Sequence, residues 1–199
     1  MSAPRERPTA TAGARTPDSP WQADDVWTNP ATGFSIRVEE TAAMTAGARL
    51  TVVATYAPYT SEPPAHYHPR QTEHFEVLGG RVRVRLDGAV RDLAAGDTLT
   101  IGAGRRHQMW NPQAEPASVR WVTEPALQTE RWMGMLLALA GRGRTNAQGI
   151  PALPQLAVLL LAFRQEIRLC RPAPWLQALL LPPVALFGRL QGLNAERAA

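Results

Sequence analysis

Short stretches that read as β-strands, separated by turn pairs, run through the middle of the chain. They lie at 34–38, 50–56, 73–77, 81–86, 99–101 and 119–123. Gly79-Gly80 and Asp87-Gly88 are typical turns between them. Arginines alternate with apolar residues in 81–86, which predicts a half-buried strand with its arginines in water. Many short strands at this spacing indicate a mainly β fold, an antiparallel sandwich or barrel.

Helical patterns replace the strand patterns after Pro125. The expected helices are 132–140, 151–170, 175–181 and 184–190. Pro182-Pro183 separates the last two, because proline interrupts helical hydrogen bonding. Four residues of the first helix are expected to pack in the core, with a lid over the barrel mouth as the alternative: Trp132, Met133, Met135 and Leu136.

The chain therefore divides into three expected parts. Residues 1–22 begin with a Pro-, Thr- and Arg-rich stretch without an apolar segment and are interpreted as a disordered tail. Residues 23–127 form the β-barrel domain, and residues 128–199 form a helical extension. The charge-free run 172–188 is a candidate membrane anchor. Its paired prolines favour helices packed on the barrel or on a second subunit, since a span needs about 20 continuous apolar residues.

Three of the four histidines and one glutamate stand at spacings that suit a metal site. His66 and His68 are two residues apart and would share one face of a strand. Pro69 breaks that strand, so Glu73 can begin a new one with its own orientation, and His107 arrives later after a glycine-rich turn. Imidazoles and a carboxylate suit one divalent ion of iron, manganese, nickel, cobalt, copper or zinc. The alternative is a set of unrelated histidines, which a His-X-His pair alone would not exclude.

Strand parity extends this hypothesis to neighbouring residues. The fourth histidine, His74, would point outward, to the surface or a subunit contact. The candidate walls of a substrate pocket, chosen by the same parity, are Tyr56, Phe75, Met109 and Trp121.

Two longer motifs resemble those of the cupin superfamily. The first family motif has His-X-His, three or four residues, Glu, six residues and Gly, and the chain matches it from His66 to Gly80. The second has Gly, five residues, Pro-X-Gly, two residues, His, three residues and Asn, and the chain matches it from Gly96 to Asn111. Thr60 stands where the first motif opens with Gly, and Gly102 replaces the proline. Both departures fall at turn positions and leave all four ligand positions filled.

This resemblance, which covers roughly residues 28–126, implies a single-domain jelly-roll β-barrel with the ion in its interior. It implies that His66, His68, Glu73 and His107 hold the metal, and that Glu73 also takes a substrate proton, as in quercetinase-like bacterial cupins. The first functional hypothesis is therefore a metal-dependent dioxygenase, an oxidoreductase acting on a small aromatic or enolic molecule. The alternatives are a non-redox isomerase or cyclase with the ion as Lewis acid, and a non-catalytic cupin that binds a small molecule.

The composition of the chain excludes one class of enzyme chemistry and bears on its partners and location. All 21 basic residues are arginine, so lysine-based Schiff-base chemistry is excluded, and their scatter argues against a nucleic-acid partner. Cys170 is the only cysteine and is expected to be a buried structural thiol. The absence of a secretory signal favours a cytoplasmic protein. A homodimer is expected, because cupin relatives pair through barrel edges and the apolar C-terminal helices offer further surface.

Overall fold

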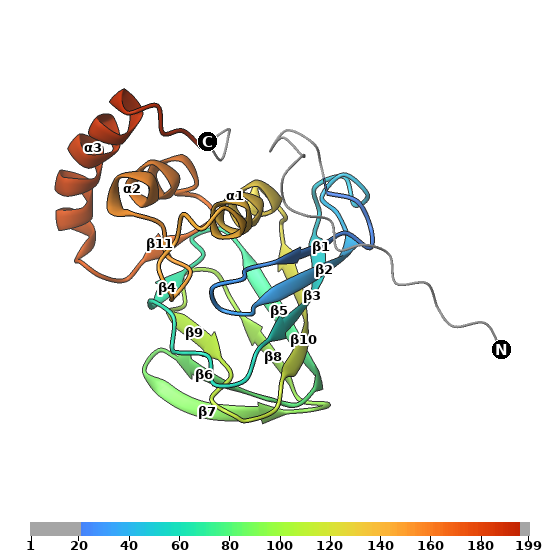
Figure 1. The fold of residues 1–199 in the computed structure, drawn as a ribbon. Coiled ribbons are helices and arrows are strands. Elements are labelled where there is room, and N and C mark those ends of the chain that lie inside the picture. The colour runs from blue at the N-terminus through green and yellow to red at the C-terminus, as the bar shows by residue number, and fades with distance from the viewer. Residues whose placement is uncertain (1–20, 196–199) are drawn as a thin grey trace.

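Two antiparallel β-sheets form a jelly roll in the computed structural model, which describes residues 21–195 (Figure 1). The first sheet has the order β1 (Val26–Thr28), β2 (Ser35–Glu40), β3 (Leu50–Tyr56), β10 (Ala117–Glu124), β5 (Thr72–Gly79) and β8 (Thr98–Ile101). The second has the order β11 (Arg168–Leu169), β4 (His66–Tyr67), β9 (His107–Trp110), β6 (Arg81–Leu86) and β7 (Ala89–Ala94).

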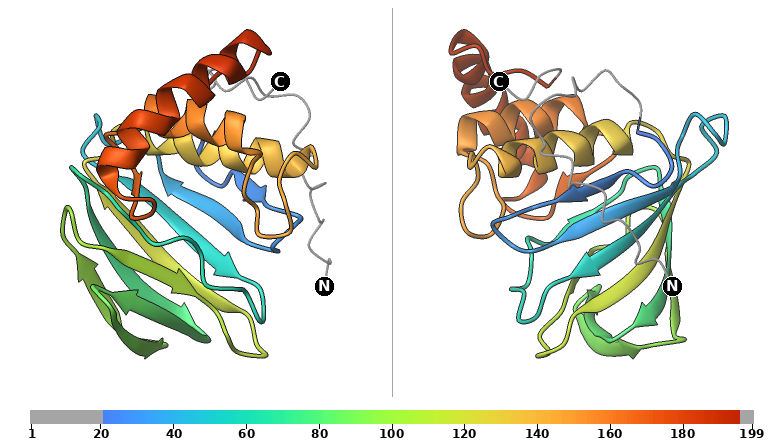
Figure 2. Two further views of the ribbon diagram at one scale, coloured as in Figure 1. Left: turned by 90° about the vertical axis from the view of Figure 1, so that its left-hand side faces the viewer. Right: turned by 45° about the vertical axis from the view of Figure 1, so that its right-hand side comes forward.

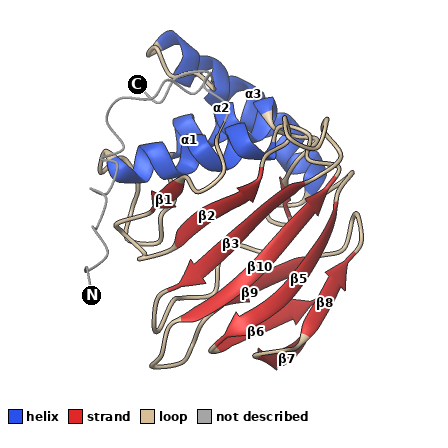
Figure 3. Cartoon of the chain, turned by 90° about the vertical axis from the view of Figure 1, so that its right-hand side faces the viewer, coloured by secondary structure: helices blue, strands red, loops and turns tan. Residues whose placement is uncertain are grey.

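The strand order confirms the mainly β jelly roll with helices at its C-terminal end. The late strand β10 lies between β3 and β5, so its neighbours come from distant parts of the sequence (Figure 3). Within residues 21–195 no ladder joins the two sheets, so the hydrogen bonding is that of a sandwich and not of a closed barrel.

Apolar side chains from both sheets meet in the space between them. This core contains Phe75, Val77, Val82, Val84, Leu93, Leu99, Ile101, Met109, Ala117 and Val119. The alternation in β6 follows the expected pattern: Val82 and Val84 are buried, while Arg83 forms an ion pair with Asp92 (2.6 Å) on the outer face. The period of two thus decides which side of each strand enters the core.

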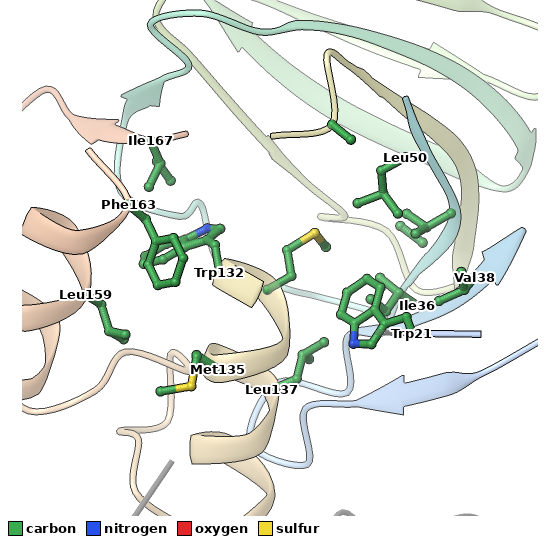
Figure 4. Packing of buried hydrophobic residues seen from close by; sticks show 14 of the residues in the cluster. Trp21, Ile36, Val38, Leu50, Trp132, Met135, Leu137, Leu159, Phe163 and Ile167 are labelled. Carbon is green, nitrogen blue, oxygen red and sulfur yellow. The ribbon is translucent and has the colours of Figure 1, made fainter. Parts of the chain in front are cut away.

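A second apolar core lies under the helix α1 (Thr129–Gly141), which confirms the helix expected at 132–140. The ring of Trp132 lies 5.8 Å from that of Phe163, and Trp21, Ile36 and Leu50 belong to the same cluster (Figure 4). The four residues weighed between core and lid are placed as follows: Trp132, Met133 and Met135 are buried, and Leu136 is half-buried against the cluster. The helical extension therefore shares its core with the β-sheets.

The start of the packed chain lies slightly before the expected boundary. Trp21 is buried, with its ring 6.0 Å from that of Trp27, although residues up to 22 were assigned to the tail. The rest of the expected disordered tail, residues 1–20, lies outside the described residues.

Two helix predictions at the C-terminal end are wrong. The helix expected at 151–170 is α2 (Leu153–Ala162), and the chain after it turns and adds β11 beside β4. The pieces expected at 175–181 and 184–190 are one helix, α3 (Pro174–Leu190), which continues through Pro182 and Pro183. Both prolines are exposed. Water can therefore bond the carbonyls whose helical donors the prolines remove, and the interruption costs less than in a core.

None of the helices within residues 21–195 is both long and apolar enough to cross a bilayer.

Candidate metal centre

Three histidines from two segments of the chain meet in the jelly roll. His66 lies in β4 and pairs directly with His107 at the start of β9, while His68 follows just after β4. One ring nitrogen from each histidine lies within 4.8 Å of those of the other two. The structure therefore brings together the three imidazoles chosen from the sequence, in an arrangement that could hold a metal ion.

Each of these imidazoles is oriented by a backbone carbonyl. The Nδ1 atoms of His66 and His107 lie 3.0 Å from the carbonyls of Pro64 and Arg105, two residues earlier in each case. Nδ1 of His68 lies 2.6 Å from the carbonyl of Glu166. Because a carbonyl only accepts, Nδ1 carries the proton in all three rings, and each neutral ring keeps its lone pair on Nε2.

Glu73 completes the group from the opposite sheet. Its carboxylate is 1% exposed, with Oε1 3.2 Å from Nε2 of His68 and Oε2 3.0 Å from Nε2 of His107. The indole Nε1 of Trp121 donates to Oε1 at 3.0 Å. Strand parity on β5 is confirmed, because Glu73 points inward while His74 points outward, contacting Thr100 (3.0 Å).

Two buried atoms at this point have no hydrogen-bond partner within the described residues: Nε2 of His68 and Oε2 of Glu73. Leaving such atoms buried and unpaired costs about 1–3 kcal/mol each. With Nδ1 protonated, a neutral His107 also presents only a lone pair to Glu73. A divalent cation would satisfy the lone pairs and the carboxylate together, so the residues present fit a bound metal.

The electrostatics of His66, His68 and Glu73 agree with that donor set. Burial, reinforced by the neighbouring histidines, lowers the pKa of His66 to about 3, and burial also lowers the pKa of His68. Burial opposes ionisation of Glu73, but His68 and His107 outweigh it and hold the pKa of this carboxyl below its usual value. Burial likewise opposes the charged form of His107, but Glu73 outweighs it and raises the pKa of that ring. A carboxylate beside two neutral imidazoles is the state that binds a cation.

The helical extension takes part in the site, which the sequence did not indicate. Besides the Glu166 carbonyl on His68, Leu169 of β11 pairs with His66, and the backbone N–H of Cys170 donates to Ala65 at 2.8 Å. A backbone carbonyl has no residue-type signature, so no sequence signal could have found this contact. Cys170 itself is half-buried and not buried as expected, with burial raising the pKa of its thiol.

The remaining motif residues shape the loops around the site. Asn111 is fully buried, and its Nδ2 donates to the carbonyls of Ala57 (3.1 Å) and Glu115 (2.7 Å). Its backbone N–H donates to the hydroxyl of Thr60 at 2.8 Å, so the residue that departs from the first motif still ties this loop down. Gly80 has φ +72°, and a Cβ there would lie 2.4 Å from the carbonyl of Pro116. That close approach explains the motif glycine.

A cavity of about 970 Å³ leads to His66, His107 and Glu73. All four expected wall residues line it: Tyr56, Phe75, Met109 and Trp121. Burial raises the pKa of Tyr56 beyond its ordinary range, so its phenol stays neutral. Sequence reasoning had assigned no cavity role to the ring of Phe34 or to Arg171, which also line it. The walls are largely apolar and aromatic, and the titratable residues His66, Glu73 and His107 also line the cavity.

Comparison with known proteins gives one family match and several distant similarities. A family model described as Cupin domain matches residues 52–123. A protein from Arthrobotrys oligospora named as an oxidoreductase is 34% identical over 50 residues, which cover 25% of this chain and 20% of that protein. The chain thus spans about a fifth of the length of this curated relative.

Solved structures with related folds include three bacterial proteins. An uncharacterized protein with a double-stranded β-helix domain from Klebsiella pneumoniae is 27% identical, covering 41% of this chain and 70% of its own, with a TM-score of 0.38. KdgF from Halomonas sp. is 17% identical, covering 52% and 90%, with a TM-score of 0.45. A predicted oxalate decarboxylase from Thermotoga maritima is 22% identical, covering 46% and 80%, with a TM-score of 0.43.

The family match spans both histidine motifs and runs from β3 to β10 of the jelly roll. Residues 52–123 therefore form a cupin domain.

Proposed function

We propose that this protein is a metal-dependent dioxygenase that acts on a small aromatic or enolic molecule. The observation that carries the proposal is the pair of unpartnered buried atoms, Nε2 of His68 and Oε2 of Glu73, at the end of a cavity with aromatic walls. His66, His68 and His107 would hold the ion, and Glu73 would join them. A bound iron, manganese, nickel, cobalt or copper ion supplies Lewis acidity and access to dioxygen chemistry.

Glu73 has the properties of a proton acceptor as well as a ligand. The neighbouring histidines hold the pKa of its carboxyl below the usual value, its Oε1 accepts from Trp121, and its Oε2 faces Nε2 of His107 at 3.0 Å. A phenolic or enolic hydroxyl at the end of the cavity would donate its proton to Oε2. The carboxylate would stay in place because the indole N–H fixes its other oxygen.

The cavity supports a substrate with a flat ring. Phe75 and Trp121 stack with their ring centres 5.7 Å apart and planes inclined by 27°, forming one continuous aromatic wall beside Glu73. A volume of about 970 Å³ accommodates a molecule with several rings. The oxidoreductase name of the Arthrobotrys protein adds support for redox chemistry.

The non-redox alternative uses the same residues. An isomerase or cyclase would also need Glu73 to move a proton and a metal to stabilise an enolate. The dioxygenase and the non-redox enzyme differ in the metal ion that they require and in whether they consume oxygen. A non-catalytic binding protein would require neither a particular ion nor oxygen.

Metal analysis and oxygen uptake test the proposal. Protein purified without added metal is expected to contain about one redox-active ion per chain, and to consume oxygen with quercetin as the probe. His66→Ala combined with His107→Ala should remove the ion, and Glu73→Gln should remove uptake. His74→Ala is the matched control, since this histidine points to solvent. Bound zinc without oxygen uptake would favour the non-redox alternative. Protein that contains no metal, and whose stability is unchanged by the double substitution, would refute the metal site.

A further inference from the structure

The helix α3 has two apolar faces. One packs on α2, where Ala185 is buried and joins Ala157 and Val158 in a small core. Gly188 on this face allows a close approach, because a Cβ there would lie 3.0 Å from the carbonyl of Pro154. Figure 2 shows α3 on the outside of α2, so the helix has protein on one side only.

The opposite face of α3 carries large apolar residues that are exposed. We call it the outer stripe, which consists of Trp175, Leu179, Leu186, Phe187 and Leu190, exposed by 55–78%. Their spacings of three, four or seven residues, with Leu186 and Phe187 adjacent, place them along one side of the helix. A helix that is apolar all round is normally buried, and a contiguous exposed stripe of this size marks a surface that something else covers.

Charge around the stripe identifies the chemistry of its partner. No charged residue lies between Arg171 and Arg189, which bracket α3 at its two ends. Residues 128–195 contain seven arginines against two glutamates, and one of the two, Glu166, is buried. An exposed apolar helix with a tryptophan and an arginine at each end, in a segment with an excess of arginine, complements an anionic lipid surface.

Other occupants fit less well. A second copy would bring the same excess of arginine to the contact. Residues 1–20 contain Met1 as their single large apolar residue, so this segment lacks the side chains to cover the stripe. Since no described helix is long and apolar enough to cross a bilayer, the helix would lie along the surface of the membrane.

We infer that the outer stripe of α3 inserts into the surface of an anionic membrane, with the arginines of the extension contacting the lipid headgroups. The apolar side chains supply the insertion and the arginines supply the preference for negative lipid, so the protein is peripheral and its attachment weakens with salt.

Vesicle sedimentation tests this inference with the full chain. Wild-type protein is expected to bind vesicles of phosphatidylcholine containing about one third phosphatidylserine at least ~10-fold more tightly than pure phosphatidylcholine vesicles. Trp175→Ser with Leu186→Ser and Leu190→Ser should weaken binding by more than ~10-fold. Val26→Ser with Val90→Ser removes two exposed apolar residues elsewhere and should leave binding unchanged.

Two further measurements keep the result unambiguous. Arg189→Glu retains the stripe and should weaken binding to the anionic vesicles, which covers the case of a triple variant that does not fold. Light scattering of wild type and triple variant reports the oligomeric state. The inference is overturned if the wild-type protein does not bind anionic vesicles, or if it binds neutral vesicles equally well. It is also overturned if the triple variant binds anionic vesicles as tightly as the wild type. A wild-type dimer that the triple substitution splits, without vesicle binding, would instead assign the stripe to a subunit interface.

Discussion

The hydrogen bond from Trp121 to Glu73 offers a direct test of how the carboxylate is held. The indole Nε1 donates to Oε1 at 3.0 Å, and Glu73 is 1% exposed, so the bond is shielded from bulk solvent. Hydrogen bonds to charged groups contribute about 1.5–3 kcal/mol. Trp121→Phe keeps an aromatic ring beside Phe75 but removes the donor. We expect it to lower the free energy of unfolding of the metal-free protein at pH 7 by about 2 kcal/mol.

A double-mutant cycle separates this bond from the change in ring size. In a Glu73→Met background no acceptor remains, so Trp121→Phe should cost only the difference in packing. The coupling energy from urea denaturation is expected to be about 1.5 kcal/mol or more. A coupling below about 0.5 kcal/mol would refute the view that Trp121 fixes the carboxylate. As a second readout, Trp121→Phe should weaken metal affinity by about 10–100-fold, the usual effect of removing a partner of a ligand.

Three other substitutions test the structure near the site and elsewhere in the fold. Gly80→Ala should lower the free energy of unfolding by more than about 2 kcal/mol in urea denaturation, because its Cβ would meet a backbone carbonyl. Gly88 also has a positive φ but lies in open space, so Gly88→Ala should lower the free energy of unfolding by about 1 kcal/mol. Cys170→Pro removes the donor to Ala65 and should lower metal affinity measured by calorimetry about 10-fold, whereas Cys170→Ala should not. The arginine and threonine beside Glu40 lower its pKa to about 2, so Glu40→Gln should destabilise the protein at pH 7. That difference should shrink as the pH falls from about 4.5 toward 2, because the unfolded state takes up the proton first; a pH-independent difference would contradict the assignment.

Most features of the β domain could be predicted from local patterns in the sequence. A period of two fixes the face of each strand side chain, which is why Glu73 and His74 were assigned to opposite sides correctly. Gly80 could be identified as a turn because glycine adopts a positive φ most readily. The proximity of His66, His68 and His107 was inferred from the motif spacing, since that spacing indicates which strands become neighbours.

The helical extension shows where local rules fail. Paired prolines predicted a break in α3, but Pro182 and Pro183 face water, which can bond the carbonyls that they leave unpaired. Residues 163–170 continued a helical pattern in the sequence, yet they turn and add β11 to the free edge of β4. Strand addition at an open edge is available only once that edge exists.

The sequence by itself determined the donor atoms, the strand faces and the cupin motifs, because side-chain type and period are local properties of the chain. Only the tertiary structure decided how the ligands are held. His68 is oriented by the carbonyl of Glu166, 98 residues away, and β4 is bordered by β11. These contacts run through the backbone, which is chemically alike at every residue, so only the packing of the extension against the jelly roll selects which carbonyl meets the ring.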